Sequence, residues 1–166
     1  SLEELVATFD FDKFSCNPPK FSYDELERLN GRILHLLPFD RVAPRLAEMG
    51  LETADTAFWM AVRPNLARLD EAREWWRVCH GEVTPVVEDR EFTAAACALL
   101  PGDYWDEASW ETWTKAVAEK TGRKGKELFK PLRLALTGCD HGPEMKALLP
   151  LMGRERVEAR LRGETA

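Results

Sequence analysis

The chain lacks the features that mark membrane-spanning and disulfide-stapled proteins. None of its hydrophobic runs reaches the roughly 18–20 apolar residues needed to cross a bilayer, and no signal-peptide pattern is found at its start. Its four cysteines are far apart and form no Cys-x-x-Cys: Cys16, Cys79, Cys97 and Cys139. Cysteines spaced in this way indicate reduced thiols packed as small hydrophobic groups, as in cytoplasmic proteins.

Familiar catalytic motifs are also missing. The sequence contains no Gly-x-Ser-x-Gly, no phosphate-binding Gly-x-x-x-x-Gly-Lys-Ser/Thr, no His-Glu-x-x-His and no Rossmann glycine fingerprint. Cys79–His80 and Cys139-x-His141 combine metal-binding residue types, but structural zinc sites usually have tighter paired spacing. We therefore expect no metal or other cofactor within these residues, and no enzyme that is complete in them.

What the sequence does contain is a large apolar fraction and a local excess of positive charge. Hydrophobic residues make up 45% of it, with six Trp and eight Phe, which is typical of a globular protein. The net charge is −6, yet between positions 115 and 133 seven basic residues face two acidic ones. The seven are Lys115, Lys120, Arg123, Lys124, Lys126, Lys130 and Arg133. Such a run is typical either of a solvated helix face or of a surface that binds nucleic acid.

Hydrophobic periodicity predicts helices along almost the whole chain. Ser22 and Glu25 form a capping-box pattern before a helix over 23–37, which ends at Pro38. One face of this helix carries Leu26, Leu29, Ile33, Leu36 and Leu37. Its length and regular spacing make it the clearest helix of the first half.

Proline and glycine divide the rest of the pattern. Residues 81–90 have the only β-like composition, and Pro85 marks them as a linker. Pro131 lies within helical spacing, so we expect a helix to start or kink there, and Pro143 is well placed to open another. We predict an all-α fold of two consecutive helical subdomains. Their limits are 38–82 and 83–166, after a helical connection at 1–37.

The stretch at 122–161, GRKGKELFKPLRLALTGCDHGPEMKALLPLMGRERVEARL, resembles the C-terminal end of bacterial glutamyl-tRNA synthetases. That family ends with Gly-x-x-Gly-Lys-x-Leu-Phe-x-Pro-Leu-Arg-x-Ala-Leu-Thr-Gly, then Gly-Pro and a final helix pair. The segments SLEELVATFDFDKF, PPKFSYDELERLNGRIL and AVRPNL are similar to the part that follows the family's KMSK-type signature. The resemblance covers essentially all 166 residues.

The resemblance implies the all-helical anticodon-binding region of a class I synthetase. Its partner would be tRNA, whose unpaired anticodon bases can be splayed, stacked and hydrogen-bonded. The Rossmann fold that activates glutamate with ATP and Mg²⁺ would lie in a preceding catalytic domain. The sequence begins without an initiator Met and inside an amphipathic pattern. We therefore expect a fragment of a monomeric, cytoplasmic enzyme that does not associate with membranes.

Carried over by position, the resemblance assigns several residues of the second half to the anticodon. Arg133 matches an arginine expected at the anticodon loop; its ordinary role would be a helix arginine whose stem covers apolar surface. Gly142, Pro143 and Met145 fall where the family's loop and helix start contact an anticodon base. Some members have a small hydroxyl residue at the position of Gly142, so only backbone contact would remain here. Lys115 matches a further cationic position.

Other candidates lie in the basic run and in the first half. We expect Lys126 and Lys130 to contact tRNA as well. Arg28 stands where many members have a tryptophan, and an arginine can stack on a base or bind phosphate. Asn65 stands where members that charge only glutamate tRNA tend to carry an arginine, thought to read the third anticodon base. Asparagine both donates and accepts, so glutamine tRNA would be charged too, unless Arg63 supplies the missing cation.

A different class of protein is also consistent with the composition. A free-standing helical module without catalytic activity could bind RNA or another protein through exposed tryptophans and leucines. Its binding to a protein partner would be insensitive to salt and to RNA, whereas tRNA binding weakens as salt rises. Salt dependence therefore separates a protein-interaction module from a tRNA-binding region.

Overall fold

The computed structural model describes residues 2–10, 13, 22–102 and 104–166, and all regular secondary structure in them is helical. The helices are α1 (Leu2–Thr8), α2 (Tyr23–Leu36), α3 (Phe39–Glu48), α4 (Thr56–Val62), α5 (Ala72–His80), α6 (Arg90–Ala98), α7 (Glu107–Thr121), α8 (Lys126–Thr137), α9 (Met145–Met152) and α10 (Arg154–Leu161). Two short 3₁₀ helices, η2 (Arg63–Asn65) and η3 (Leu69–Glu71), lie between α4 and α5. Strands are absent from these ranges, which confirms the all-α prediction.

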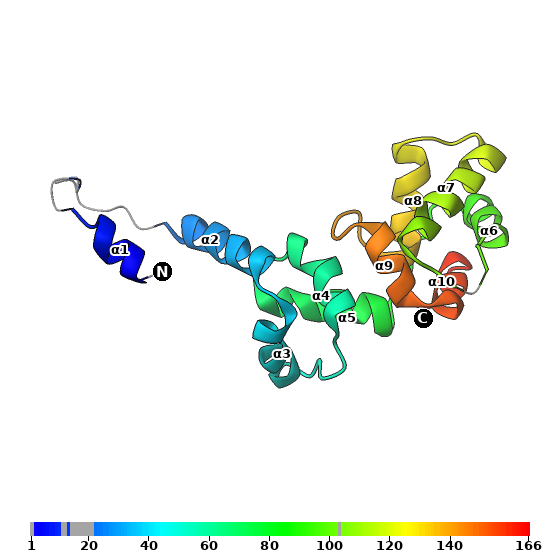
Figure 1. Cartoon of the computed structure of the whole chain (residues 1–166). Coiled ribbons are helices and arrows are strands. Elements are labelled where there is room, and N and C mark those ends of the chain that lie inside the picture. Colours follow the sequence, from blue (N-terminus) through cyan, green and yellow to red (C-terminus); the bar gives the residue numbers. More distant parts are fainter. Residues whose placement is uncertain (1, 11–12, 14–21, 103) are drawn as a thin grey trace.

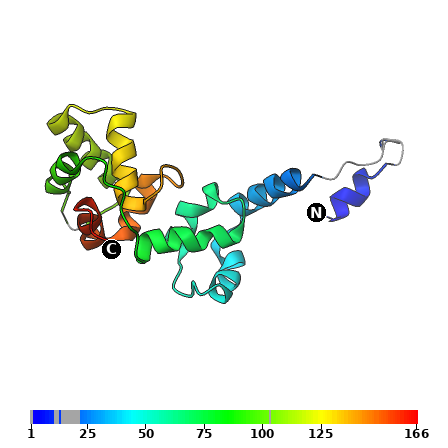
Figure 2. The same ribbon diagram turned by 180° about the vertical axis from the view of Figure 1, so that it is seen from behind.

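The helices follow one another along an elongated molecule (Figure 1). The first group of helices consists of α3, α4 and α5, and α2 extends from it. The second group consists of α6 to α10. The view from behind shows the same order (Figure 2). Both α4 and α5 pack against α9, so one buried core continues from one group into the other. Between the groups, residues 81–89 form no helix, as expected of a linker. The subdomain limits at 37/38 and 82/83 stay predictions.

The apolar stripe of α2 faces outward from the rest of the chain. Leu26, Leu29 and Ile33 are 49–53% exposed, and Leu36 is 81% exposed. The buried side of the helix instead consists of Gly31 and Leu34.

Helix ends follow the predicted signals with two shifts. Ser22 caps α2, as predicted, because its side chain accepts a hydrogen bond from the backbone amide of Glu25. Pro131 does not start a helix: α8 begins earlier and continues through it, with one backbone hydrogen bond fewer. Pro143 does not open α9, which begins at Met145. The carbonyl of Pro143 instead accepts a hydrogen bond from the side chain of Arg133 in α8.

Three properties of the described residues complete the fold. None of their helices is long and apolar enough to cross a membrane. Cys79, Cys97 and Cys139 are free thiols, as predicted, whereas Cys16 lies outside the described residues. In the same ranges, no three His, Cys, Asp or Glu side chains come close enough together to hold a metal ion.

Candidate nucleic-acid interface

Basic and aromatic side chains alternate along one side of α8. Helical spacing of three and four residues places them on the same face. They are Lys126, Phe129, Lys130 and Arg133, named here the α8 stripe. Phe129 is 44% exposed, whereas Lys130 and Arg133 are half-buried. The opposite side of α8 is anchored in the core through Leu128, Leu132 and Ala135. The fold therefore brings three of the predicted RNA-binding residues to one surface.

Arg133 is held by the backbone of the loop between α8 and α9. Its Nη2 donates a hydrogen bond to the carbonyl oxygen of Pro143 (2.9 Å), and its Nη1 to that of His141 (3.3 Å). Burial lowers the pKa of the guanidinium, but an arginine remains charged at neutral pH. Its other N–H groups thus belong to a fixed, charged fork, the geometry that suits base edges and phosphates.

A hollow of about 260 Å³ lies beside this guanidinium. It is lined by Trp110, Phe129, Arg133, Glu144, Met145 and Lys146. The rings of Trp110 and Phe129 are 6.3 Å apart between centroids and tilted by 34°. Aromatic faces of this kind stack on unpaired bases of any sequence. We name this site the aromatic hollow.

Sequence patterns alone did not place either aromatic ring of the hollow at an RNA site. Phe129 had the spacing of a core residue, and Trp110 is one of six tryptophans in the chain. The available signal was the interleaving of Phe129 with Lys126 and Lys130, because aromatic residues between cations are typical of single-strand binding.

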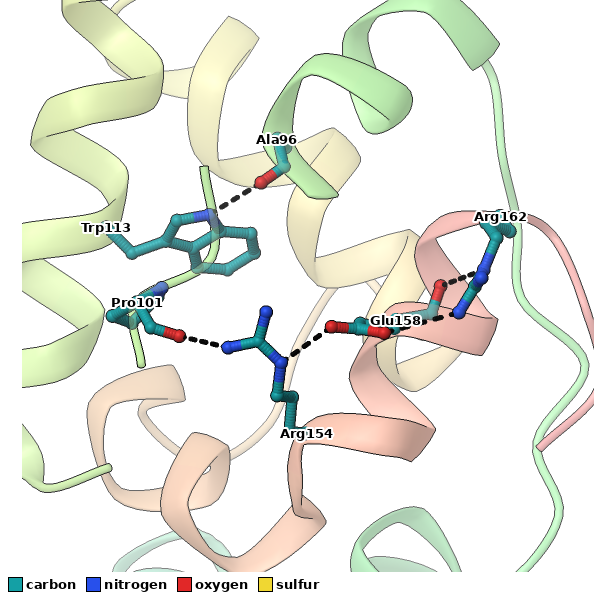
Figure 3. A network of polar contacts seen from close by, with 6 residues as sticks. All are labelled: Ala96, Pro101, Trp113, Arg154, Glu158 and Arg162. Atoms are coloured by element: carbon teal, nitrogen blue, oxygen red, sulfur yellow. Dashed lines mark hydrogen bonds and ion pairs between the residues drawn. The ribbon is translucent and has the colours of Figure 1, made fainter. Parts of the chain in front are cut away.

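Two separate sets of polar contacts lie near the helix that carries Trp110 (Figure 3). Arg154 of α10 donates from Nη1 to the carbonyl of Pro101 and from Nε to Glu158 (2.7 Å), while Arg162 contacts the same carboxylate. In the same region the indole of Trp113 donates to the carbonyl of Ala96 (2.8 Å). Trp113 in turn packs edge-on against Trp110, with 5.6 Å between centroids. Trp110 of the aromatic hollow therefore packs against a tryptophan that is hydrogen-bonded to α6.

The other predicted cations of the second half line two further hollows, not the aromatic hollow. Lys126 and Lys130 line one of about 670 Å³ next to Arg123. Arg123 is already engaged, since it pairs with Asp89 and its guanidinium lies 4.2 Å from the ring centroid of Phe92. Lys115 is exposed on α7 and lines a hollow that also contains Glu111 and Glu119. The basic run is thus divided between two helices and is not one continuous patch.

Two residues predicted in the first half line the same hollow. Arg28 of α2 and Asn65 of η2 line one hollow of about 570 Å³. It forms where α2 approaches the backbone after η2: Asn30 Nδ2 donates to the carbonyl of Ala67 (2.6 Å).

Arg63 has a structural partner. Its Nη1 donates to the carbonyl of Leu37 at the end of α2 (3.0 Å), and the indole of Trp59 donates to the same oxygen (2.8 Å). A cation at a helix C-terminus is favourable because the last carbonyls lack partners. This accounts for Arg63 without RNA, and any role for it in reading a base stays a prediction.

Comparison with known proteins agrees with this geometry. Residues 88–164, which include the α8 stripe and the aromatic hollow, match the family described as anticodon binding domain. Residues 88–164 belong to that family. The matched residues comprise α6 to α10, the second of the two groups of helices.

Similar proteins cover the whole chain, beyond residues 88–164. It is 57% identical over its whole length to a glutamate–tRNA ligase of Azospirillum brasilense. It is 53% identical to glutamate–tRNA ligase 2 of Methylorubrum populi. The chain spans 37% of the length of each of these relatives. A crystal structure of glutamate–tRNA synthetase from Elizabethkingia anophelis shares the fold, with a TM-score of 0.79, 21% identity, and coverage of 97% of this chain and 35% of that one.

Proposed function

We propose that the chain binds the anticodon loop of glutamate tRNA as part of a glutamate–tRNA ligase. The observation that carries the proposal is the aromatic hollow, where the fixed guanidinium of Arg133 meets two aromatic rings and the first turn of α9. Stacking on the rings and hydrogen bonds to Arg133 suit a base that has left the helical stack. The lysines of the α8 stripe would hold nearby phosphates.

The reaction itself belongs to the rest of the polypeptide in this proposal. The full-length enzyme would attach glutamate to tRNA, using ATP and Mg²⁺ bound outside these 166 residues. The relatives named above support this division, because they are glutamate–tRNA ligases of which the chain spans 37%. We also propose that the enzyme acts in the cytoplasm as a monomer. The 166-residue chain alone would attach no glutamate to tRNA.

The hollow between α2 and η2 would receive a second anticodon base. Arg28 and Asn65 face it together, and the asparagine amide accepts as well as donates. As part of the proposal, the enzyme therefore glutamylates glutamine tRNA as well as glutamate tRNA.

The outward stripe of α2 is the surface that the rest of the polypeptide would cover. Four apolar side chains spaced three and four residues apart form a continuous exposed face. A face of this kind usually packs against another domain or partner. Nearly two thirds of the relatives' length lies outside the chain, so the preceding catalytic part of the same protein is the occupant we propose.

Thiol labelling tests this docking. In the 166-residue chain, Ile33→Cys is expected to react quickly, because Ile33 is 49% exposed. In the full-length protein the labelling rate of this cysteine should fall by roughly tenfold or more. Tenfold corresponds to about 1.4 kcal/mol of free energy for the docking that covers the residue. Glu27→Cys, on another side of α2, is the control and should react equally in both. Equal rates for Ile33→Cys would contradict the docking, and dimerisation of the chain alone would assign the stripe to a second copy.

The salt dependence of RNA binding tests the proposed function. For the 166-residue chain and an anticodon stem-loop of glutamate tRNA, log K should fall linearly with log salt. Replacing Lys126 or Lys130 with alanine should reduce the slope by about 0.7–0.9 for each phosphate that the lysine neutralises. Lys13→Ala should leave the slope unchanged, because Lys13 pairs with Asp10 just after α1, and α1 lies at the opposite end of the molecule from α8 (Figure 1). Binding that is independent of salt would instead favour a protein-interaction module.

A further inference from the structure

Gly142 lies directly against the indole ring of Trp75. A Cβ at Gly142 would overlap Cη2 and Cζ2 of the ring and lie 2.9 Å from Cζ3. Gly142 also has a φ of +119°, a conformation that residues with side chains rarely adopt. Trp75 itself is only 6% exposed. Both the backbone and its neighbour therefore require glycine at this position.

The contact joins the two groups of helices beside the aromatic hollow. Trp75 belongs to α5, and Gly142 to the loop between α8 and α9, which reaches toward α4 and α5 (Figures 1 and 2). The two carbonyls that bind Arg133 belong to His141 and Pro143, the residues on either side of Gly142. The loop is thus supported by the indole at its middle residue and held by the guanidinium at the residues flanking it.

We propose that Trp75 is a positioning residue for reading one anticodon base, an inference that rests on the proposed function. The six-membered part of the indole sets the position of the backbone at 141–143, and this backbone orients the guanidinium of Arg133. Because the indole leaves no room for a side chain at position 142, an unpaired nucleobase is read here by Arg133 and by backbone groups of the loop. Specificity at that base therefore depends on a residue of α5, which lies outside the matched residues 88–164.

Trp75→Phe isolates this role, because it removes the ring atoms that support Gly142 and keeps an aromatic residue in the core. Trp76→Phe is the matched control: the same change at the next residue of α5, where the ring packs edge-on against Phe58 (4.9 Å between centroids). Binding of the 166-residue chain is measured with anticodon stem-loops that carry each base in turn at each anticodon position. Helix content and the salt slope are recorded for every variant.

Trp75→Phe should reduce the ratio of affinities for the cognate base and the other bases at one anticodon position by roughly fivefold or more. Fivefold is the smallest factor expected when hydrogen bonds to one base are lost. The salt slope should not change, since every phosphate-binding lysine remains in place, and Trp76→Phe should retain the preference. Gly142→Ala tests the contact from the loop side and should abolish the same preference. If wild type prefers the cognate base and either Trp75→Phe or Gly142→Ala retains the full preference, the positioning role is wrong. Absence of binding by wild type would instead overturn the proposed function.

Discussion

Replacing Arg160 with methionine is expected to lower the free energy of unfolding by about 3–5 kcal/mol. The side chain is 0% exposed. Its guanidinium donates hydrogen bonds of 2.7–2.9 Å to backbone carbonyls of Val78, Gly81, Leu136 and Ala166. Methionine fills similar space but leaves these carbonyls buried without a donor, which costs about 1–3 kcal/mol for each group that water cannot reach.

The position of Arg160 explains why so many acceptors converge on it. Val78 and Gly81 are at the C-terminal end of α5, and Leu136 is in the last turn of α8, where helix carbonyls lack partners. Burial, followed by the nearby Arg156, lowers the pKa of the guanidinium to about 10, so it is still charged at neutral pH. One cation thus completes two helix ends and ties the two groups of helices together.

Urea unfolding of the 166-residue chain, followed by circular dichroism, measures the effect. Arg162→Met is the matched control, because Arg162 lies on the surface and its contact with Glu158 is 3.4 Å. That variant should lose no more than about 1 kcal/mol. A loss at Arg160 no larger than the loss at Arg162 would show that the buried hydrogen bonds do not hold the two groups together.

The second large effect concerns the choice of tRNA. In the full-length enzyme, wild type is expected to glutamylate glutamate and glutamine transcripts within roughly tenfold of each other. Asn65→Arg should reject the glutamine transcript by roughly a hundredfold, which corresponds to about 2.7 kcal/mol. Asn65 is exposed and lines the hollow with Arg28. A guanidinium placed there offers charge-assisted bonds to one base, whereas the amide tolerates both.

Asn65→Ala tests whether the amide of Asn65 contacts the anticodon base in both transcripts. Without the amide, both transcripts should be charged less well, and their ratio should stay that of wild type. If wild type already rejects the glutamine transcript by a hundredfold or more, about 2.7 kcal/mol, relaxed discrimination is wrong. The binding of Arg63 to the carbonyl of Leu37 is the reason to expect that this arginine does not replace the missing cation.

Local signals in the sequence predicted the helices and several of their ends. Ser22 caps α2 as predicted, because a hydroxyl cap acts within a few residues. Pro143 was misplaced as a helix start, and of the two outcomes expected at Pro131, a start or a kink, the start is wrong because α8 continues through it. At Pro143 the reason lies in a hydrogen bond from Arg133, which reaches its carbonyl across the loop.

Contacts between distant parts of the chain could not be predicted in this way. Arg160 is one of four arginines between positions 154 and 162, and nothing local distinguishes it from the exposed Arg162. Its partner Val78 is 82 residues away. The pairing of Trp110 with Phe129, and of Trp75 with Gly142, likewise depends on how helices pack. The position of Arg133 was carried over from the family resemblance, but its orientation came only from the fold.

The central claim is that this chain recognises an anticodon loop by its bases. Its most direct test is titration of the wild-type 166-residue chain with the anticodon stem-loop of glutamate tRNA. The competitor is the same stem with all three anticodon bases changed. We predict that the cognate loop binds roughly tenfold or more tightly at equal salt, since each base contact contributes about 1–3 kcal/mol. Equal affinity for the two loops would contradict the claim, because it would leave only contacts to phosphate.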